Sequence, residues 1–161
     1  MNPTAVLSDD GEMLDNPAWS AARRFQPDVS PFAAVKSATE ASLQALRVLL
    51  PEGESALLVS QEQVPAVDGL HTSHLFDVLQ MIDTPGAGGD EGDAVRLTAS
   101  DASDMVDLAS RTKPGPFGPR TFEMGDYIGL RRNGRLVAMA GERLQVGRFV
   151  EISAVCVDAE F

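Results

Sequence analysis

A glycine-rich segment near the middle of the chain constrains its fold more than any other feature. Residues 84–93 read TPGAGGDEGD and hold four glycines, one proline and three acidic residues. This composition is typical of a flexible connection and supplies few side chains for a core. We therefore expect a linker there, between an N-terminal α/β lobe over residues 1–83 and a second domain over residues 94–161.

The two parts differ in charge. Residues 1–93 carry four Lys or Arg and fifteen Asp or Glu, whereas residues 94–161 carry nine of each. A nucleic-acid-binding surface needs clustered basic side chains, so the acidic first part argues against a nucleic-acid partner. The acidic residues are expected to form a solvated face rather than a site for cationic partners.

Membrane and secretory signals are absent from the sequence. No apolar run reaches the length of about 18 residues that indicates a membrane span. The N-terminus MNPTAVLSDDGEML lacks the basic and apolar regions of a secretory signal. The single cysteine, Cys156, excludes an internal disulfide, so we expect a cytoplasmic protein with no membrane partner.

Hydrophobic periodicity predicts the regular elements. In the first part we expect a helix over 17–25, a helix over 38–50, a strand over 55–60 and mainly a strand over 70–82, where a helix stays open. In the second part we expect a strand over 95–98, a helix after Asp101, an irregular segment over 111–120, a helical turn over 121–125, and strands over 126–132, 135–144 and 148–157. Asn133-Gly134 predicts a two-residue hairpin turn between two of these strands.

Searches for catalytic and metal-binding motifs find little. There is no phosphate-binding loop, dinucleotide fingerprint or nucleophile elbow. His71 and His74 stand three residues apart and would point to opposite faces of a strand, with no third ligand evident, so we expect no metal. Cys156 is expected to be a small buried hydrophobe rather than a nucleophile.

Two segments carry a resemblance to a known family. They are KPGPFGPRT over 113–121 and EISAVCVD over 151–158, supported by LVAMAGER over 136–143. These segments resemble the GNAT N-acetyltransferases, in particular the bacterial branch with a GNAT-like N-terminal lobe. The resemblance is good over 94–161 and weak over 15–82. It implies an α+β fold with a mixed, mostly antiparallel sheet flanked by helices, in which the first lobe is a degenerate GNAT-like half.

The end of the sequence departs from the family pattern. In these enzymes the strand is followed by a basic, glycine-rich turn of the R-G-x-G type, whose amides bind the cofactor pyrophosphate at a helix N-terminus. This sequence ends at Phe161, where that turn is expected to begin. We therefore expect a domain that is incomplete at its C-terminus, and 161 residues that are inactive on their own.

The resemblance implies a site for acetyl-CoA on the last strand. The pantetheine arm would pair with the backbone of Val155, Cys156 and Val157 as an added strand. A backbone N–H there would also stabilise the oxyanion of the thioester. The alternative is that these three residues belong only to the core.

The resemblance also implies the base that deprotonates the amine. Glu151 matches the base of the histone-acetylating branch. Its alternative role is an ion pair with Arg143 or Arg148, and Glu123 is a weaker candidate for the base.

The loop after the first helix of the second domain is expected to wall the acceptor site. There Phe117 would pack on the substrate and Arg120 would pair with an anionic group on it. The alternative is a rigid Pro-Gly loop with an anchoring phenylalanine.

The implied activity is transfer of an acetyl group from acetyl-CoA to a primary amine of a small molecule or peptide, by direct attack. The alternative is a non-catalytic GNAT-fold protein that binds a ligand or partner. A homodimer stays open.

Overall fold

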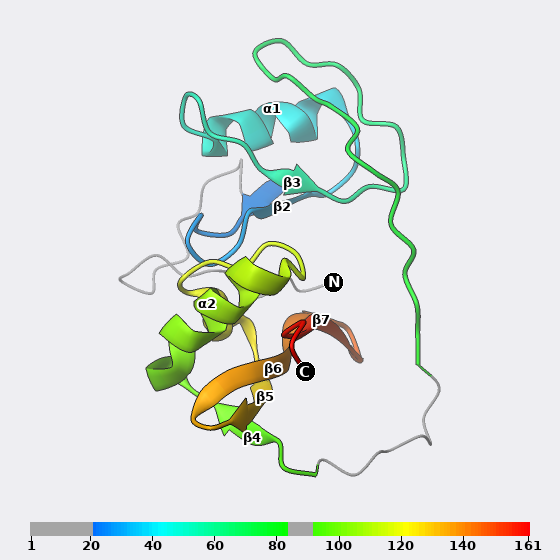
Figure 1. Cartoon of the computed structure of the whole chain (residues 1–161). Helices are drawn as coiled ribbons and strands as arrows, with labels where there is room; N and C mark the ends of the chain where they lie inside the picture. The colour runs from blue at the N-terminus through cyan, green and yellow to red at the C-terminus, as the bar shows by residue number, and fades with distance from the viewer. Residues whose placement is uncertain (1–20, 84–91) are drawn as a thin grey trace.

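The computed structural model describes residues 21–83 and 92–161, which form two separate sheets (Figure 1). Residues 1–20 and 84–91 are outside the described part. Most of the linker expected at 84–93 and the start of the helix expected at 17–25 therefore lie outside the described residues.

The first sheet has three strands in the order β1-β2-β3, namely β1 (Ala22–Arg24), β2 (Phe32–Val35) and β3 (Leu57–Leu58). β1 and β2 are antiparallel, whereas β2 and β3 are parallel and need a crossover. Helix α1 (Glu40–Leu49) makes that crossover, and the Thr39 side chain caps its first turn by accepting from the Ser42 N–H. The helix buries Leu43 and Leu46.

The second sheet is antiparallel throughout and has the order β4-β5-β6-β7. Its strands are β4 (Val95–Leu97), β5 (Tyr127–Arg132), β6 (Arg135–Val146) and β7 (Phe149–Val157). Between β4 and β5 lie the short helix η2 (Ala99–Asp101), helix α2 (Ala102–Thr112) and the helical turn η3 (Thr121–Met124). Asn133 and Gly134 adopt φ values of 52° and 81°, which confirms the hairpin turn expected from their sequence.

The main core lies between α2 and one face of the second sheet. Met105 and Leu108 of α2 are fully buried there. They pack with Leu97, Ala109, Tyr127, Leu136, Met139, Ala154 and Cys156. The opposite face of this sheet carries exposed apolar side chains, including Ile128, Ile152 and Val155. The arrangement confirms the expected α+β fold with a mostly antiparallel sheet flanked by helices.

Contacts across the two sheets hold them together. The Thr121 hydroxyl donates to the Val29 carbonyl at 2.6 Å, and the Arg120 N–H donates to the Asp28 carbonyl at 3.1 Å. A Cβ on Gly118 would lie 2.6 Å from that Asp28 oxygen, so glycine permits the close approach of the two backbones. The loop before β5 is therefore fixed against the loop between β1 and β2.

Two expectations for the first part are wrong. The helix expected at 17–25 is replaced in its described part by strand β1, because the backbone of Ala22–Arg24 pairs with β2. The strand expected at 70–82 has no regular structure, and its apolar side chains are exposed, with Leu79 at 94%. In Figure 1 this segment follows β3 as a long trace that joins neither sheet.

No helix in the described part of the chain is both long and apolar enough to cross a membrane.

Candidate active site

Strand β7 forms one edge of the second sheet. Among the described residues, β6 is its only strand neighbour. The Asp158 N–H donates to the Val137 carbonyl of β6 at 2.7 Å. Because backbone groups alternate along a strand, the N–H and C=O of Val157 point away from β6. The outer edge of β7 therefore offers backbone donors and acceptors to a ligand that adds as a strand.

A β-bulge interrupts β7 in the middle of this edge. Ser153 pairs with Gly141 and Cys156 with Met139, so two residues of β7 oppose one of β6. The first of the two, Ala154, has a φ of 53°, in a region that costs an alanine about 1–2 kcal/mol. Bulges of this kind release backbone groups from the ladder and are common beside active sites.

The side chains of the three residues expected to bind acetyl-CoA divide between two faces. Val155 and Val157 are exposed, at 63% and 57%. Cys156 is buried as a free thiol in the core cluster, as expected for a small hydrophobe. The backbone N–H and C=O of Cys156 alternate with those of Val157 and therefore point toward β6, so contact of Cys156 with acetyl-CoA stays a prediction.

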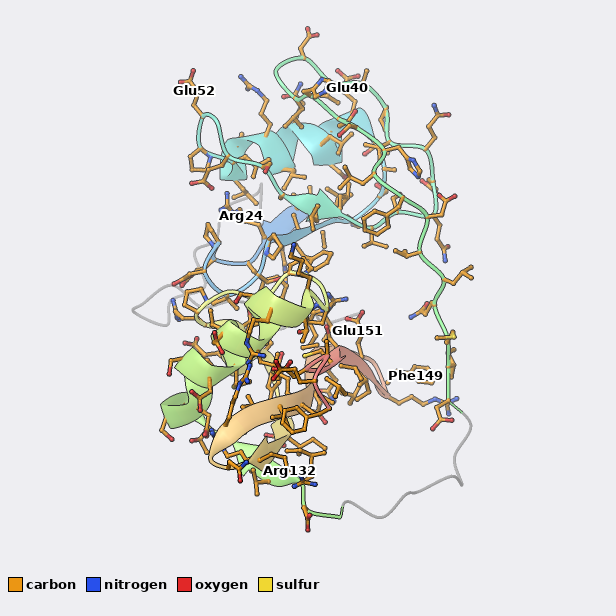
Figure 2. All side chains as sticks on the ribbon, viewed as in Figure 1. Arg24, Glu40, Glu52, Arg132, Phe149 and Glu151 are labelled. Atoms are coloured by element: carbon orange, nitrogen blue, oxygen red, sulfur yellow. The ribbon has the colours of Figure 1, made fainter. Side chains whose placement is uncertain are left out.

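Glu151, the expected base, forms an ion pair (Figure 2 labels it on β7). The Arg143 guanidinium donates to its two carboxylate oxygens at 3.0 and 2.5 Å. The guanidinium of Arg143 also lies over the Phe32 ring of β2, 4.6 Å from the centroid. Arg148 stacks instead on Phe149. The ion pair thus holds Glu151 near the junction of the two sheets.

The candidates in the loop before β5 already have partners within the protein. Arg120 donates to both carboxylate oxygens of Glu123 at 2.8 Å and to Asp28 at 3.3 Å. These carboxylates raise the pKa of Arg120 above its ordinary value, with Glu123 the larger cause. Phe117 packs edge-on against Tyr127, with ring centroids 5.8 Å apart. Contact of Phe117 or Arg120 with an acceptor stays a prediction.

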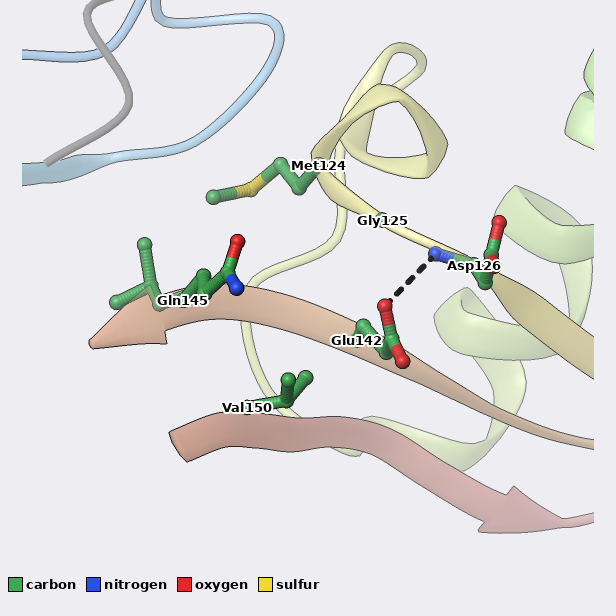
Figure 3. Close-up of a pocket in the computed structure, with 7 residues that line it drawn as sticks. Met124, Gly125, Asp126, Glu142, Gln145 and Val150 are labelled. Carbon is green, nitrogen blue, oxygen red and sulfur yellow. Dashed lines mark hydrogen bonds between the residues drawn. The ribbon is translucent and has the colours of Figure 1, made fainter. Parts of the chain in front are cut away.

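A hollow of 320 Å³ opens beside β6 and the start of β7 (Figure 3). Its lining includes the carboxylates of Asp126 and Glu142, together with Met124, Gly125, Leu144, Gln145 and Val150. Glu142 accepts weakly from the Asp126 N–H at 3.5 Å, and Asp126 is paired with Arg96. In the described part of the chain, no ion pair engages Glu142.

Sequence reasoning did not single out Asp126 and Glu142. Glu142 is the only acidic residue within the apolar strand expected at 135–144, and that isolation was a usable signal. Because Asp126 is paired with Arg96, the negative character of the hollow comes from Glu142, and it suits a cationic amine.

His71 and His74 both lie in the exposed segment after β3. His74 pairs with Asp77 at 3.0 Å, and both side chains are exposed. Among the described residues, no group of three or more His, Cys, Asp or Glu is placed to hold a metal ion.

Comparisons with known proteins identify a structural relative of this chain. No protein-family model matches the sequence, and no curated protein matches it significantly. A crystal structure from Novosphingobium aromaticivorans DSM 12444, described as a candidate acetyltransferase of the GNAT family, is similar in fold and sequence. The two chains are 30% identical with a TM-score of 0.72, and the match covers 92% of this chain and 72% of that one.

Proposed function

This chain belongs to the GNAT family of acetyltransferases, and from that premise we propose that it transfers an acetyl group from acetyl-CoA to a primary amine. The acceptor class that we propose is a small molecule or a peptide. The observation that carries the proposal is the outer edge of β7, which pairs with no strand in the described part of the chain and is interrupted by the bulge at Ala154. The buried free thiol of Cys156 is consistent with the reducing, cytoplasmic setting that we assign to the reaction.

In this proposal the outer edge of β7 binds the pantetheine arm by backbone hydrogen bonds. Val157 contributes the N–H and C=O that point away from β6. The backbone around the Ala154 bulge lies next along the strand and would face the thioester. The exposed Val155 and Val157 side chains would cover the arm on one side.

The acceptor is an amine whose pKa, about 10.4 for a lysine side chain, keeps it protonated at neutral pH. We assign the removal of one proton to the Glu151 carboxylate. The nitrogen lone pair then attacks the carbonyl carbon, a C–N bond forms and the C–S bond breaks. The nitrogen then releases a second proton, and the departing CoA thiolate takes it up. Negative charge from Glu142 would attract the cationic acceptor to the hollow that this residue lines.

The test of cofactor binding is a calorimetric titration of the protein with acetyl-CoA, compared between two variants. Val157→Pro removes the outward N–H without breaking a bond to β6, and we expect it to weaken acetyl-CoA binding about 10-fold, the value of one hydrogen bond of about 1.4 kcal/mol. Val157→Thr keeps the N–H and the branched shape, and binding should be near that of the natural chain. Equal affinity of both variants would contradict binding through the backbone.

The test of the base is Glu151→Gln, compared with Glu142→Gln. In the full-length protein we expect Glu151→Gln to lower kcat about 100- to 1000-fold while the Kd for acetyl-CoA stays within about two-fold. Release of CoA thiol from acetyl-CoA with a panel of primary amines measures kcat. If only Glu142→Gln lowers kcat, the base is the carboxylate in the hollow and not Glu151.

One observation favours the alternative function, a GNAT-fold protein that binds without catalysis. Glu151 is held by both nitrogens of an Arg143 fork, as in an ion pair of purely structural use. That alternative predicts acetyl-CoA binding in the titration and no thiol release with any amine.

A further inference from the structure

Arg143 is the extra residue of a second β-bulge, this one in β6. Two consecutive residues of β6, Arg143 and Leu144, oppose the single residue Glu151 of β7. A bulge of this kind changes the direction in which a side chain points, and such bulges are common beside active sites. From this bulge the Arg143 side chain contacts two partners at once, one on β7 and one on β2.

The partner on β7 is the proposed base. The Nε and Nη2 atoms of Arg143 donate to the two carboxylate oxygens of Glu151 at 3.0 and 2.5 Å. A carboxylate has about four lone-pair positions, and these two hydrogen bonds occupy one on each oxygen. The side chain of Glu151 is 39% exposed, whereas that of Arg143 is 19% exposed. The guanidinium therefore fixes the orientation of the carboxylate and leaves it able to accept a proton from an amine.

The partner on β2 is an aromatic ring from the first sheet. Phe32 lies on the middle strand of that sheet, with its ring centroid 4.6 Å from the guanidinium carbon of Arg143. Ala33 and Val35 belong to or pack against the core cluster that includes Leu46 of α1. Because side chains alternate along a strand, Phe32 lies on the face of β2 that points away from α1. Packing in the core of the first sheet thus does not account for the position of the ring.

Contacts on both sides of Phe32 fix its position relative to β6. The Phe32 carbonyl accepts from the Phe25 N–H at 3.2 Å. In the loop that leads into β2, the Val29 carbonyl accepts from the Thr121 hydroxyl of the second domain at 2.6 Å. A side chain on a strand held in this way positions its neighbours more precisely than one on a loop does.

We propose that Arg143 and Phe32 are positioning residues for Glu151: the Phe32 ring holds the Arg143 guanidinium, and the guanidinium holds the carboxylate toward the acceptor nitrogen. This inference rests on the proposed function. Arginine suits the role because its planar guanidinium stacks on a ring and binds a carboxylate through two nitrogens at the same time. The first sheet thereby contributes to the reaction through a side chain that need not touch acetyl-CoA or the amine.

The first test is Phe32→Leu in the full-length protein. Leucine stays apolar but removes the ring face, and we expect kcat to fall about 10-fold because the base is then held less precisely. The KM for the amine and the Kd for acetyl-CoA should stay within about two-fold. Phe32→Tyr keeps the ring and should retain kcat. An unchanged kcat in Phe32→Leu, or a change in the KM for the amine alone, would overturn the inference.

Val35→Ala is the matched control for this test. Val35 lies on the same strand but packs toward α1, so its truncation weakens the core of the first sheet and leaves the ring of Phe32 in place. We expect Tm to fall in Val35→Ala, while kcat measured well below Tm stays unchanged. If kcat falls as much in Val35→Ala as in Phe32→Leu, only the stability of the first sheet matters and the inference is overturned.

The second test determines whether Phe32 acts through Arg143. Arg143→Lys keeps the positive charge but loses the two-nitrogen contact and the planar stack, so we expect kcat to fall at least about 10-fold. Phe32→Leu added to Arg143→Lys should lower kcat no further, because the ring has already lost the group that it holds. Full activity of Arg143→Lys, or effects of the two changes that multiply, would overturn the inference.

The two proposals fail in different ways. If the full-length protein binds acetyl-CoA and releases thiol with an amine while Phe32→Leu and Arg143→Lys are equally active, only the positioning roles are overturned. If the unaltered full-length protein binds no acetyl-CoA and releases no thiol with any amine, the proposed function is overturned and this inference with it.

Discussion

At the scale of single residues, Gly141 of β6 leaves room for the ring of its β5 partner, Tyr127. Its φ is not in the left-handed region, so backbone conformation does not require glycine there. The requirement is steric, because any Cβ would overlap the Tyr127 ring. Glycine at this position therefore lets the Tyr127 ring pack across β6.

We expect Gly141→Ala to lower the free energy of unfolding by about 3 kcal/mol, because the added methyl must displace a packed aromatic ring. Urea unfolding measures the change. Gly53→Ala is the control: its Cβ meets nothing within 4 Å, and its φ of 81° alone should cost about 1 kcal/mol. An equal loss in both variants would contradict a steric role for Gly141.

Some features of single residues could be predicted from the sequence. The Asn133-Gly134 turn was predictable because the type I′ turn restricts which residues fit. The Arg143 partner of Glu151 was foreseen as an alternative to catalysis, since the two residues face each other across a hairpin. The buried Tyr127 hydroxyl has no hydrogen-bond partner in the described part of the chain, and this was not predictable because it depends on the side chains that neighbouring elements bring near it.

At the scale of elements, Asp158 fixes the end of β7 to the neighbouring elements. Its side chain pairs with Arg111 at the end of α2 and with Arg135 at the start of β6, the latter at 2.8 Å. Burial alone would raise the pKa of Asp158, but the Glu160 N–H and the two arginines together lower it below its ordinary value. The carboxylate is therefore more stable in the folded protein than in the unfolded chain.

The direction of this pKa shift predicts how stability depends on pH. The contribution of Asp158 is complete above the ordinary Asp pKa of about 3.9, and it is lost as the pH falls through the lower pKa of the folded state. We expect Asp158→Asn to lower Tm by about 5 °C at pH 7, and the difference to shrink below about pH 4. Thermal unfolding, monitored by circular dichroism at each pH, measures the difference in Tm.

Asp107→Asn is the control for this experiment. Asp107 pairs with the same Arg111 at 3.0 Å, but its carboxylate is exposed, so the change in Tm should be small. A difference between Asp158→Asn and the natural chain that stays constant from pH 7 into acid would contradict the assigned role of the Asp158 charge.

Element prediction succeeded where periodicity and turn signals agreed. The helix and the strands after residue 94 were predictable because turn residues separate them and their apolar patterns are regular. In the first part, β1 forms through pairing with β2, and no pattern within Ala22–Arg24 encodes that partner. The apolar segment 70–82 has the residues of a strand, but a strand needs a partner that composition does not reveal.

At the scale of the whole molecule, the proposed base Glu151 lies near the contacts between the two sheets. Arg143 of β6 reaches Phe32 of β2, and Thr121 reaches Val29, 92 positions away along the chain. These contacts hold the candidate base and the loop before β5 against the first sheet. Sequence periodicity carries no information on such distant pairs, whereas the family resemblance indicates the strand on which we propose the site.

The central claim is that acetyl-CoA binds along the outer backbone of β7, and amide hydrogen exchange measured by NMR tests it most directly. With saturating acetyl-CoA we expect exchange of the Val157 N–H to slow at least about 10-fold, the effect of one new hydrogen bond. The Asp158 N–H, already bonded to Val137, should change much less. Unchanged exchange at Val157 while acetyl-CoA is bound would contradict the account.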